Sequence, residues 1–428
     1  MSSYRISTAG QQSAAIAQML QQQALIAKTQ QQVSSGVRVQ TPADDPVAES
    51  RILSIQNAQS QLDQYGKNAD AATDRLNQGE QALADLATLL QRIQELAEQA
   101  NSGAMDDTSL NSIATELKSH VSDLQQIANR QDSNGEYLFA GYSTGTQPFA
   151  GSGGGMTYVG DQGVRQLQIG ASQTVADGIP GQQVFMDIPQ GNGTFTVTAG
   201  SNSGTGVIGV QQVVDAAQWN AAVAANAAAT PPLANQYTIR FTDPDGDGTA
   251  DSWELLDANG NPVMDNGTPP AAVTGTYTDG GSISFDGIQF TLSGQPAAGD
   301  TFQVQPAGTE SMFQTLNDLI TALGNGNGTP QLQTQLGTAL NKALSQLDNG
   351  LNNAINLRTE VGARLSSLDT ASSLRDDLNA QLTTSLSNTQ DVDMAQAIGQ
   401  LNQQMLGLQA AQAAYTRIGQ LSLFDYLR

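Results

Sequence analysis

Cysteine is absent from this 428-residue chain, and histidine occurs only once, at His120. Without thiols there is no disulfide framework and no Cys-ligated metal site. A single imidazole also excludes clustered His–metal sites and leaves no support for a Ser–His–Asp triad. The spacing of its neighbours places His120 on or beside an apolar helix face, so we interpret it as a packing histidine. Aromatic residues make up only 5% of the chain, which is below what a large aromatic-lined active site would suggest. Since no catalytic groups are evident in the sequence either, we expect no enzyme.

Basic residues and long apolar runs are scarce too. Lys and Arg number 17 against 40 Asp and Glu, which gives a formal net charge of −23. Because phosphate binding needs Lys and Arg, we expect no nucleic-acid partner and no anionic membrane surface. No stretch reaches the roughly 18 apolar residues of a spanning helix, so we expect no membrane insertion. The first residues lack the apolar region of a cleavable secretory signal, which leaves open an export route that reads an uncleaved N-terminus.

A helical repeat is the strongest signal in the sequence. From Ile55 to Ala100 apolar residues recur at alternating intervals of 3 and 4, and only Gly79 in this series lacks an apolar side chain. Such a 3.5-residue repeat forms one apolar seam along a helix and requires a partner helix. A second amphipathic helix follows, with its apolar face between Leu110 and Ile127.

The ends of the first long helix have their own signals. Proline is favoured in a first helical turn, and Thr or Asp is favoured as the N-cap. We therefore expect the helix to start at Pro42 or Pro46, with Thr41 or Asp45 as its cap, and to end at the Asn-Ser-Gly sequence of residues 101–103.

The C-terminal part of the chain mirrors this pattern. One seam, mainly of leucine, runs from Leu340 to Leu386, and after a break near Asn388 another amphipathic run covers residues 394–415. A weaker apolar stripe covers residues 16–26. Two terminal amphipathic helices, each followed inward by a longer one, predict antiparallel pairing of the two chain ends.

The middle of the chain is strand-like and acidic. Asp286-Gly287 is a strong hairpin turn signal, and residues 259–262 mark another turn. From Gly141 to Gln305 there are 14 acidic residues, two arginines and no lysine, so we expect this part to face solvent. Apolar and polar residues alternate, as in strands, at residues 195–198, 237–241, 282–285, 288–292 and 301–304.

These patterns predict an α+β fold, in which a long helical coiled-coil bundle formed by both chain termini carries an inserted β-rich domain. We expect terminal helices in residues 1–42 and 392–428 and a helical rod domain in residues 43–140 and 308–391. The inserted β-rich outer domain would be residues 141–307.

Three sequence blocks stand out: Val33–Pro46, which contains Thr-Pro-Ala-Asp-Asp-Pro, Asn134–Phe149, and the C-terminal block Gln420–Arg428. Together they resemble the flagellar hook-associated protein 3 family, within the bacterial flagellin superfamily. Flagellins share the Ser-Ser-Gly and Ala-Asp-Asp parts of the first block but close with a different apolar tail. The resemblance covers roughly residues 1–150 and 310–428 and says little about the middle.

The resemblance implies a structural subunit of a tubular assembly at the hook–filament junction, secreted by the flagellar type III apparatus without a cleaved signal. Its partners would be other copies of itself, the neighbouring hook-associated protein, flagellin, and an export chaperone at the C-terminal helix. Thin apolar stripes bury too little surface to offset ordering entropy. We therefore predict that about the first and last 40 residues become ordered on assembly.

One acidic segment has the spacing of an EF-hand calcium loop, in which carboxylate and carbonyl oxygens surround a hard cation. Its flanks are strand-like rather than helical, so an acidic hairpin tip that binds no metal is the alternative. We expect no required cofactor, with calcium as a hypothesis. The candidate ligands, at positions 1, 3, 5, 7, 9 and 12 of the loop, are Asp243, Asp245, Asp247, Thr249, Asp251 and Glu254.

Three other functions stay open. The first is a flagellin filament subunit, which shares the helical ends. The second, from a different class, is an extracellular calcium-binding adhesin or coiled-coil surface protein, and the sequence blocks at both ends argue against it. The third is an enzyme acting on surface polymers, for which the sequence offers no catalytic residues.

Overall fold

A computed structural model describes residues 8–102, 105–151, 155–229, 231–246, 248–265 and 269–426. The chain divides into two compact units, Met1–Lys67 with Thr370–Arg428, and Asn68–Asp369. The long helices α2 (Pro46–Ala100) and α6 (Pro330–Gln390) contribute to both units. The division into terminal helices, helical rod and β-rich domain expected from the sequence differs from these two units. It stays a prediction.

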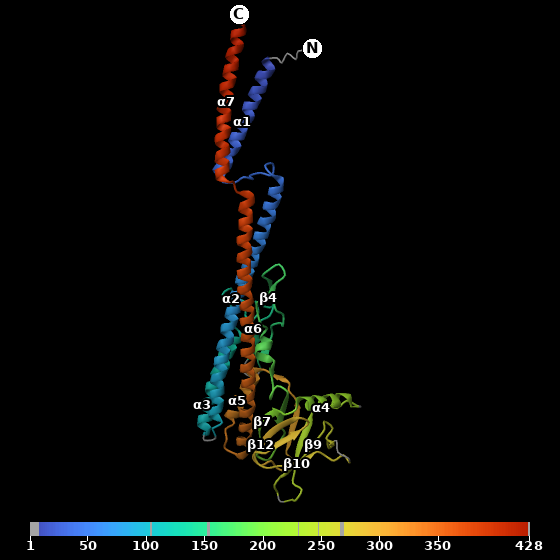
Figure 1. Ribbon diagram of the computed structural model, residues 1–428. Coiled ribbons are helices and arrows are strands. Elements are labelled where there is room, and N and C mark those ends of the chain that lie inside the picture. Colours follow the sequence, from blue (N-terminus) through green and yellow to red (C-terminus); the bar gives the residue numbers. More distant parts are fainter. Residues whose placement is uncertain are drawn as a thin grey trace. The chain divides into compact units, whose positions relative to one another are not determined.

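The first unit joins the two ends of the chain. Helices α1 (Thr8–Ser35) and α7 (Met394–Tyr426) lie side by side (Figure 1). The Thr29 hydroxyl donates to the Gln404 side-chain oxygen over 3.0 Å, and an antiparallel bridge pairs Val37 with Asp391. The predicted antiparallel pairing of the chain ends is confirmed.

The start of α2 decides between the two caps expected from the sequence. The helix begins at Pro46, and the Asp45 carboxylate accepts a hydrogen bond from the Ala48 backbone N–H over 3.0 Å. The start at Pro42 with Thr41 as cap is wrong, because the Asp44 carboxylate binds the Thr41 N–H and hydroxyl, both over 3.0 Å, and holds these residues in a turn. Asp45 is therefore the N-cap.

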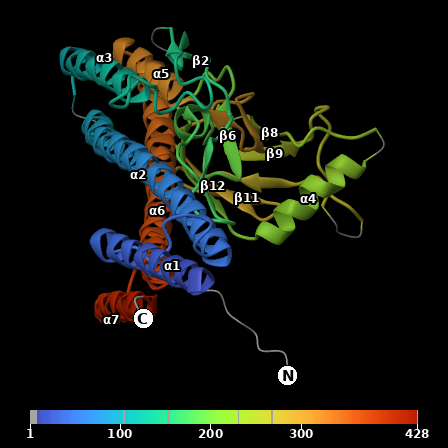
Figure 2. The same ribbon diagram turned by 90° about the horizontal axis from the view of Figure 1, so that it is seen from above.

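The helical part of the second unit consists of stretches of α2 and α6 with α3 (Asp107–Ala128) and α5 (Met312–Gly324). The predicted seam of α2 is confirmed, since every seam residue from Ile55 to Ala100, at the alternating intervals of 3 and 4, is buried or half-buried. Figure 2 shows α3 and α5 at the same end of this unit, where they contact each other. Helix α5 packs closely against α6 at Gly350, which has no side chain. A Cβ atom added to Gly350 would lie 2.0 Å from the Met312 Cε atom of α5.

The β-rich part of the second unit contains two main antiparallel sheets. The five-stranded sheet has the order β10 (Thr274–Thr276), β9 (Ser252–Leu256), β8 (Tyr237–Thr242), β13 (Thr301–Pro306), β6 (Phe195–Ala199). The three-stranded sheet has the order β11 (Ser282–Phe285), β12 (Ile288–Ser293), β7 (Val207–Val213). Short pairs join β1 (Phe149–Ala150) to β2 (Thr157–Tyr158), β3 (Gln166–Gln168) to β4 (Thr174–Ala176), and β5 (Ile188–Pro189) to β14 (Thr309–Glu310). Two further helices are the π-helix Gln182–Met186 and α4 (Ala216–Ala228).

The predicted hairpin between β11 and β12 is present. Phe285 pairs with Ile288, and both turn residues have positive φ, 45° at Asp286 and 80° at Gly287. This conformation suits a two-residue hairpin turn whose twist matches the strands. The five predicted strand segments all fall within strands of the structure, whereas α4 and β7 were not predicted.

Buried apolar side chains of both sheets belong to one core, and aromatic rings make up much of it. Phe195 contacts Trp219, and Phe241 contacts both Phe302 and Tyr277 through edge-on or tilted rings 5.2–6.0 Å apart. Edge-on aromatic pairs add to the free energy gained by burial alone. The α+β fold with an inserted β-rich region is confirmed.

Candidate assembly surface

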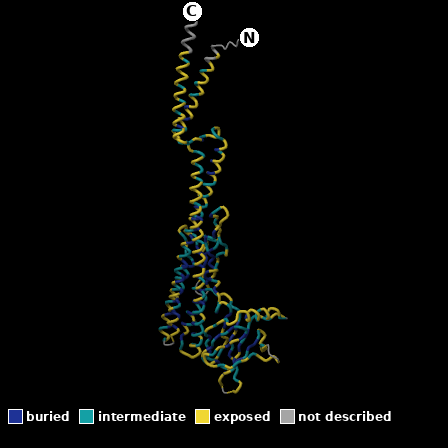
Figure 3. The backbone as a smooth tube through the Cα atoms, viewed as in Figure 1, coloured by how far each residue is buried: buried dark blue, intermediate teal, exposed yellow. Residues whose placement is uncertain are grey.

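The helices α1 and α7 leave most of their surface to solvent. Among their described side chains, only Ile26, Thr29 and Ala397 are buried, and Figure 3 draws both helices mainly in the colour of exposed residues. An amphipathic helix normally buries its apolar stripe against the rest of the chain. Here the α1–α7 pair covers only part of each stripe.

Large apolar side chains occupy the uncovered faces. Leu20 is 60% exposed and Leu406 is 69% exposed, and fully burying one such side chain would contribute about 1.5–3 kcal/mol. Sequence periodicity did not identify Leu25 and Leu406, which lie off the predicted seams. The sequence feature that could have identified these two residues is a leucine at a position where the helix pattern predicts a polar residue. The full set lies on more than one side of the helix pair. We call it the assembly face, and it is Ile16, Leu20, Leu25, Met394, Ile398, Met405 and Leu406.

A groove between α1 and α7 adds to this surface. It has a volume of about 310 Å³ and carries no charged side chain. Its lining residues are Ala15, Gln18, Met19 and Gln22 of α1 with Gly407, Ala411, Ala414 and Tyr415 of α7. Small residues at four of these positions keep the groove open, so side chains of another helix have room to enter.

Hydrogen bonds join the segment between α1 and α2 to the last residues of α6 and the segment between α6 and α7. Arg38 donates from Nη2 to the Thr389 carbonyl over 2.7 Å and forms an ion pair with Asp45 at 3.3 Å. The Val392 N–H donates to the Gly36 carbonyl over 2.9 Å, and Gly36 has a φ of +74°, which glycine adopts without strain. The first resemblance block therefore joins the two chain ends at one place.

Asp44 within this block makes the stability of the first unit dependent on pH. Ion pairing with Lys28 at 2.7 Å, followed by hydrogen bonds from Thr41, lowers the pKa of Asp44 from 3.8 to about 2. A lowered pKa stabilises the folded state above the unfolded pKa, and this stabilisation is lost as the pH falls through about 4 to 2. We expect Asp44→Asn to weaken the dependence of the unfolding temperature on pH between 5 and 2. An identical pH dependence in the variant would contradict this assignment.

The candidate calcium loop is partly described. The Asp243 carboxylate accepts hydrogen bonds from the N–H groups of Gly246 and Gly248, over 2.8 and 2.9 Å. Glu254 lies on β9 and pairs with Arg240 at 2.6 Å. Asp245, Thr249 and Asp251 are exposed, and Asp247 lies outside the described residues. Within the described part of the chain no three acidic or histidine side chains are grouped as metal ligands.

Calcium binding stays a prediction, and titration tests it directly. If the loop binds calcium, the ion should raise the unfolding temperature and release or absorb heat on titration, because an ion that binds only the folded state stabilises it. The variant Asp243→Asn/Asp245→Asn should lose both responses. The absence of heat and of a thermal shift in the unchanged protein would remove the hypothesis.

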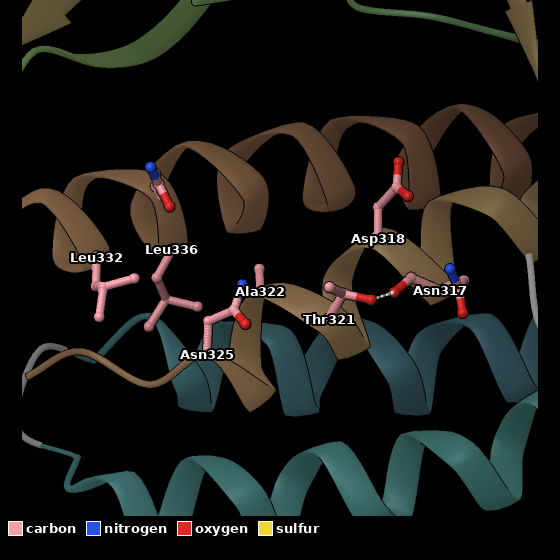
Figure 4. Close-up of a pocket in the computed structure, with 8 residues that line it drawn as sticks. Asn317, Asp318, Thr321, Ala322, Asn325, Leu332 and Leu336 are labelled. Carbon is pink, nitrogen blue, oxygen red and sulfur yellow. Dashed lines mark hydrogen bonds between the residues drawn. The ribbon is translucent and has the colours of Figure 1, made fainter. Parts of the chain in front are cut away.

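No catalytic arrangement is evident among the described residues. A cavity of about 420 Å³ between α5 and α6 is lined mainly by amide, hydroxyl and leucine side chains, with Asp318 as its one carboxylate (Figure 4). His120 is half-buried and lies with Nδ1 3.3 Å from an Asp123 oxygen, which agrees with a packing histidine. In the described parts of the chain, no helix is both long and apolar enough to cross a bilayer.

Comparison with known proteins assigns the family. The model of the bacterial flagellin N-terminal helical region matches residues 6–144, and that of the flagellar hook-associated protein 1 D2-like domain matches residues 263–306. The solved structure of Xanthomonas campestris FlgL is 32% identical, with 78% of this chain and 99% of that chain covered and a TM-score of 0.67. The chain belongs to the FlgL family. The resemblance to flagellar hook-associated protein 3 is thereby confirmed.

Two further relatives support membership of the FlgL family. The structure of hook-associated protein 3 from Legionella pneumophila is 27% identical, with 79% of this chain and 98% of that chain covered and a TM-score of 0.70. The flagellar hook-associated protein 3 of Salmonella typhimurium is 36% identical over 161 residues, which are 38% of this chain. This FlgL-family chain spans about half the length of the curated relatives it matches, 50% in the Salmonella case.

Proposed function

We propose that this chain is a structural subunit of the bacterial flagellum that joins hook to filament as a junction ring. The assembly face of α1 and α7 carries the proposal, because these two helices lie against each other and still leave large apolar side chains uncovered among the described residues. Neighbouring copies of the chain, which carry the same side chains, would bury them. The mechanism is polymerisation through helix seams, and the role is structural rather than catalytic.

The charge of the β-rich part supports a solvent-facing role for it. Its two arginines are already paired, Arg165 with Asp177 at 2.5 Å and Arg240 with Glu254 at 2.6 Å. The remaining carboxylates give the segment a strong negative charge. Such a surface is well hydrated and favours a position in contact with water.

We further propose export by the flagellar type III apparatus, and a chaperone that covers α7 before export. Exposed side chains such as Ile398 and Leu406 would associate prematurely unless they were covered. The neighbouring hook-associated protein and flagellin would contact the chain after export.

Assembly onto isolated hooks tests the proposed function. Hooks that already carry the preceding hook-associated protein should bind the full-length chain, and flagellin added afterwards should then form filaments. Failure to bind, or filament growth only when this chain is left out, would contradict the proposal.

The alternative within the superfamily is a filament subunit, favoured by the flagellin model that matches the N-terminal helices. Seeding distinguishes the two functions. When filament fragments are added to the purified chain, a filament subunit should elongate them without limit, whereas a junction subunit should not.

A further inference from the structure

The oxidisable sulfur of this protein is confined to methionine. The chain has nine methionines and no cysteine, so a peroxide can oxidise thioether sulfur but finds no thiol to oxidise. Oxidation converts a flexible apolar methionine into a polar sulfoxide, and exposed methionines react first. The exposure and the position of each methionine therefore decide what oxidation does to the molecule.

Methionine exposure differs widely among the described residues. Met394 and Met405 of α7 are 44% and 38% exposed, and Met264 of the β-rich part is 54% exposed. Met156 and Met312 are buried, with 4% and 2% of their surfaces exposed. The first three should react with peroxide much faster than the last two.

Both exposed methionines of α7 belong to the assembly face. Met394, Ile398 and Met405 recur at the 4- and 7-residue spacings that bring side chains to one side of a helix. Leu401 and Leu408 of the same series are half-buried. The methionines thus occupy the side of the series that α1 leaves open.

We infer that Met394 and Met405 form an oxidation-sensitive switch that controls whether the subunit can assemble, an inference that rests on the proposed function. In each reaction a peroxide oxygen forms a bond to Sδ while the O–O bond breaks. The sulfur loses two electrons and the peroxide is reduced to water. A sulfoxide oxygen buried between helices without a hydrogen-bond donor opposes association. Each oxidised methionine should lower the affinity at least about tenfold.

The test compares the full-length chain before and after treatment with hydrogen peroxide, using the binding to hooks described above. Treatment should prevent assembly of the unchanged protein. The variant Met394→Leu/Met405→Leu has no thioether at either position, so its treated sample is compared with its own untreated sample, and the treatment should not change its binding. Met264→Leu, the matched control, should stay as sensitive as the unchanged protein.

Three outcomes of the binding experiment would overturn the inference: assembly of the treated protein at the untreated rate, equal sensitivity of the double Leu variant, or resistance produced by Met19→Leu alone. If the untreated protein fails to bind hooks, the proposed function fails instead. Peptide mass spectrometry of the free subunit needs no assembly. Met394 and Met405 should gain oxygen as fast as Met264, and rates as slow as those of Met156 and Met312 would contradict the inference.

Discussion

Replacing Leu20 and Leu406 together by Glu should abolish binding to hooks while leaving the subunit folded. Both side chains are more than half exposed, so the folded chain loses little by the change. In an assembly that covers the face, each new carboxylate would be buried without a partner, which costs several kcal/mol or more. Co-sedimentation with hooks measures the loss, and circular dichroism verifies that the helices persist.

The matched control is Val210→Glu. Val210 is 65% exposed, as the two leucines are, but it lies on β7 of the β-rich part and outside the assembly face. This variant should bind hooks as the unchanged protein does. Normal binding by the double Glu variant would show that the uncovered face of α1 and α7 is not the assembly surface.

Arg75→Ala should destabilise the second unit by about 3–5 kcal/mol, because it leaves a buried carboxylate without its charge partner. The Arg75 and Asp132 side chains are only 7% and 6% exposed, and their atoms Nη1 and Oδ2 lie 2.8 Å apart. Arg75 also binds Glu136 at 3.3 Å and donates to the Tyr137 carbonyl over 2.8 Å. Chemical unfolding followed by far-ultraviolet circular dichroism measures the change.

Arg92 provides the comparison for Arg75. It lies on the same helix and pairs with Glu95 and Glu116, but its side chain is 48% exposed. Exposed ion pairs contribute about 0–1 kcal/mol. Arg92→Ala should therefore lower the free energy of unfolding far less than Arg75→Ala. Equal losses would show that burial of the Arg75–Asp132 pair does not increase its contribution to stability.

The features predicted from the sequence are those encoded by neighbouring residues. The apolar seam of α2 follows from the regular spacing of residues 55–100, and the hairpin follows from Asp286-Gly287, whose backbone conformation few other residue pairs accept. The choice of Asp45 over Thr41 as the cap could not be predicted, because it depends on the Asp44 side chain binding Thr41.

The missed features depend on distant partners or on weak local patterns. Asp132 and Glu136 lie 57 and 61 residues from Arg75, and periodicity carries no information about such a pair. Helix α4 is short and rich in alanine, and it is fixed by the buried Trp219 and by Asp215, which caps Ala217 and Gln218. The regular pairing of β7 is interrupted by a register shift between the pairs Phe290–Gln211 and Leu292–Ile208.

The candidate site shows the same division. Amphipathic terminal helices and their pairing could be predicted from spacing alone. Which apolar residues stay uncovered could not, because the exposure of Leu25 and Leu406 depends on how α1 and α7 lie against each other. The acidic loop keeps the spacing of a calcium site, but Glu254 is paired with Arg240 across the sheet, a contact that ligand spacing does not anticipate.

Hydrogen exchange of the full-length subunit, free and bound to hooks, tests most directly whether α1 and α7 are completed only by neighbouring copies. The amides of both helices should exchange quickly in the free subunit and at least about a hundredfold more slowly in the assembly. Amides along the buried seam from Ala69 to Ala100 should be slow in both states. If α1 and α7 are already as protected in the free subunit as that seam, the terminal helices do not need neighbours and the account is contradicted.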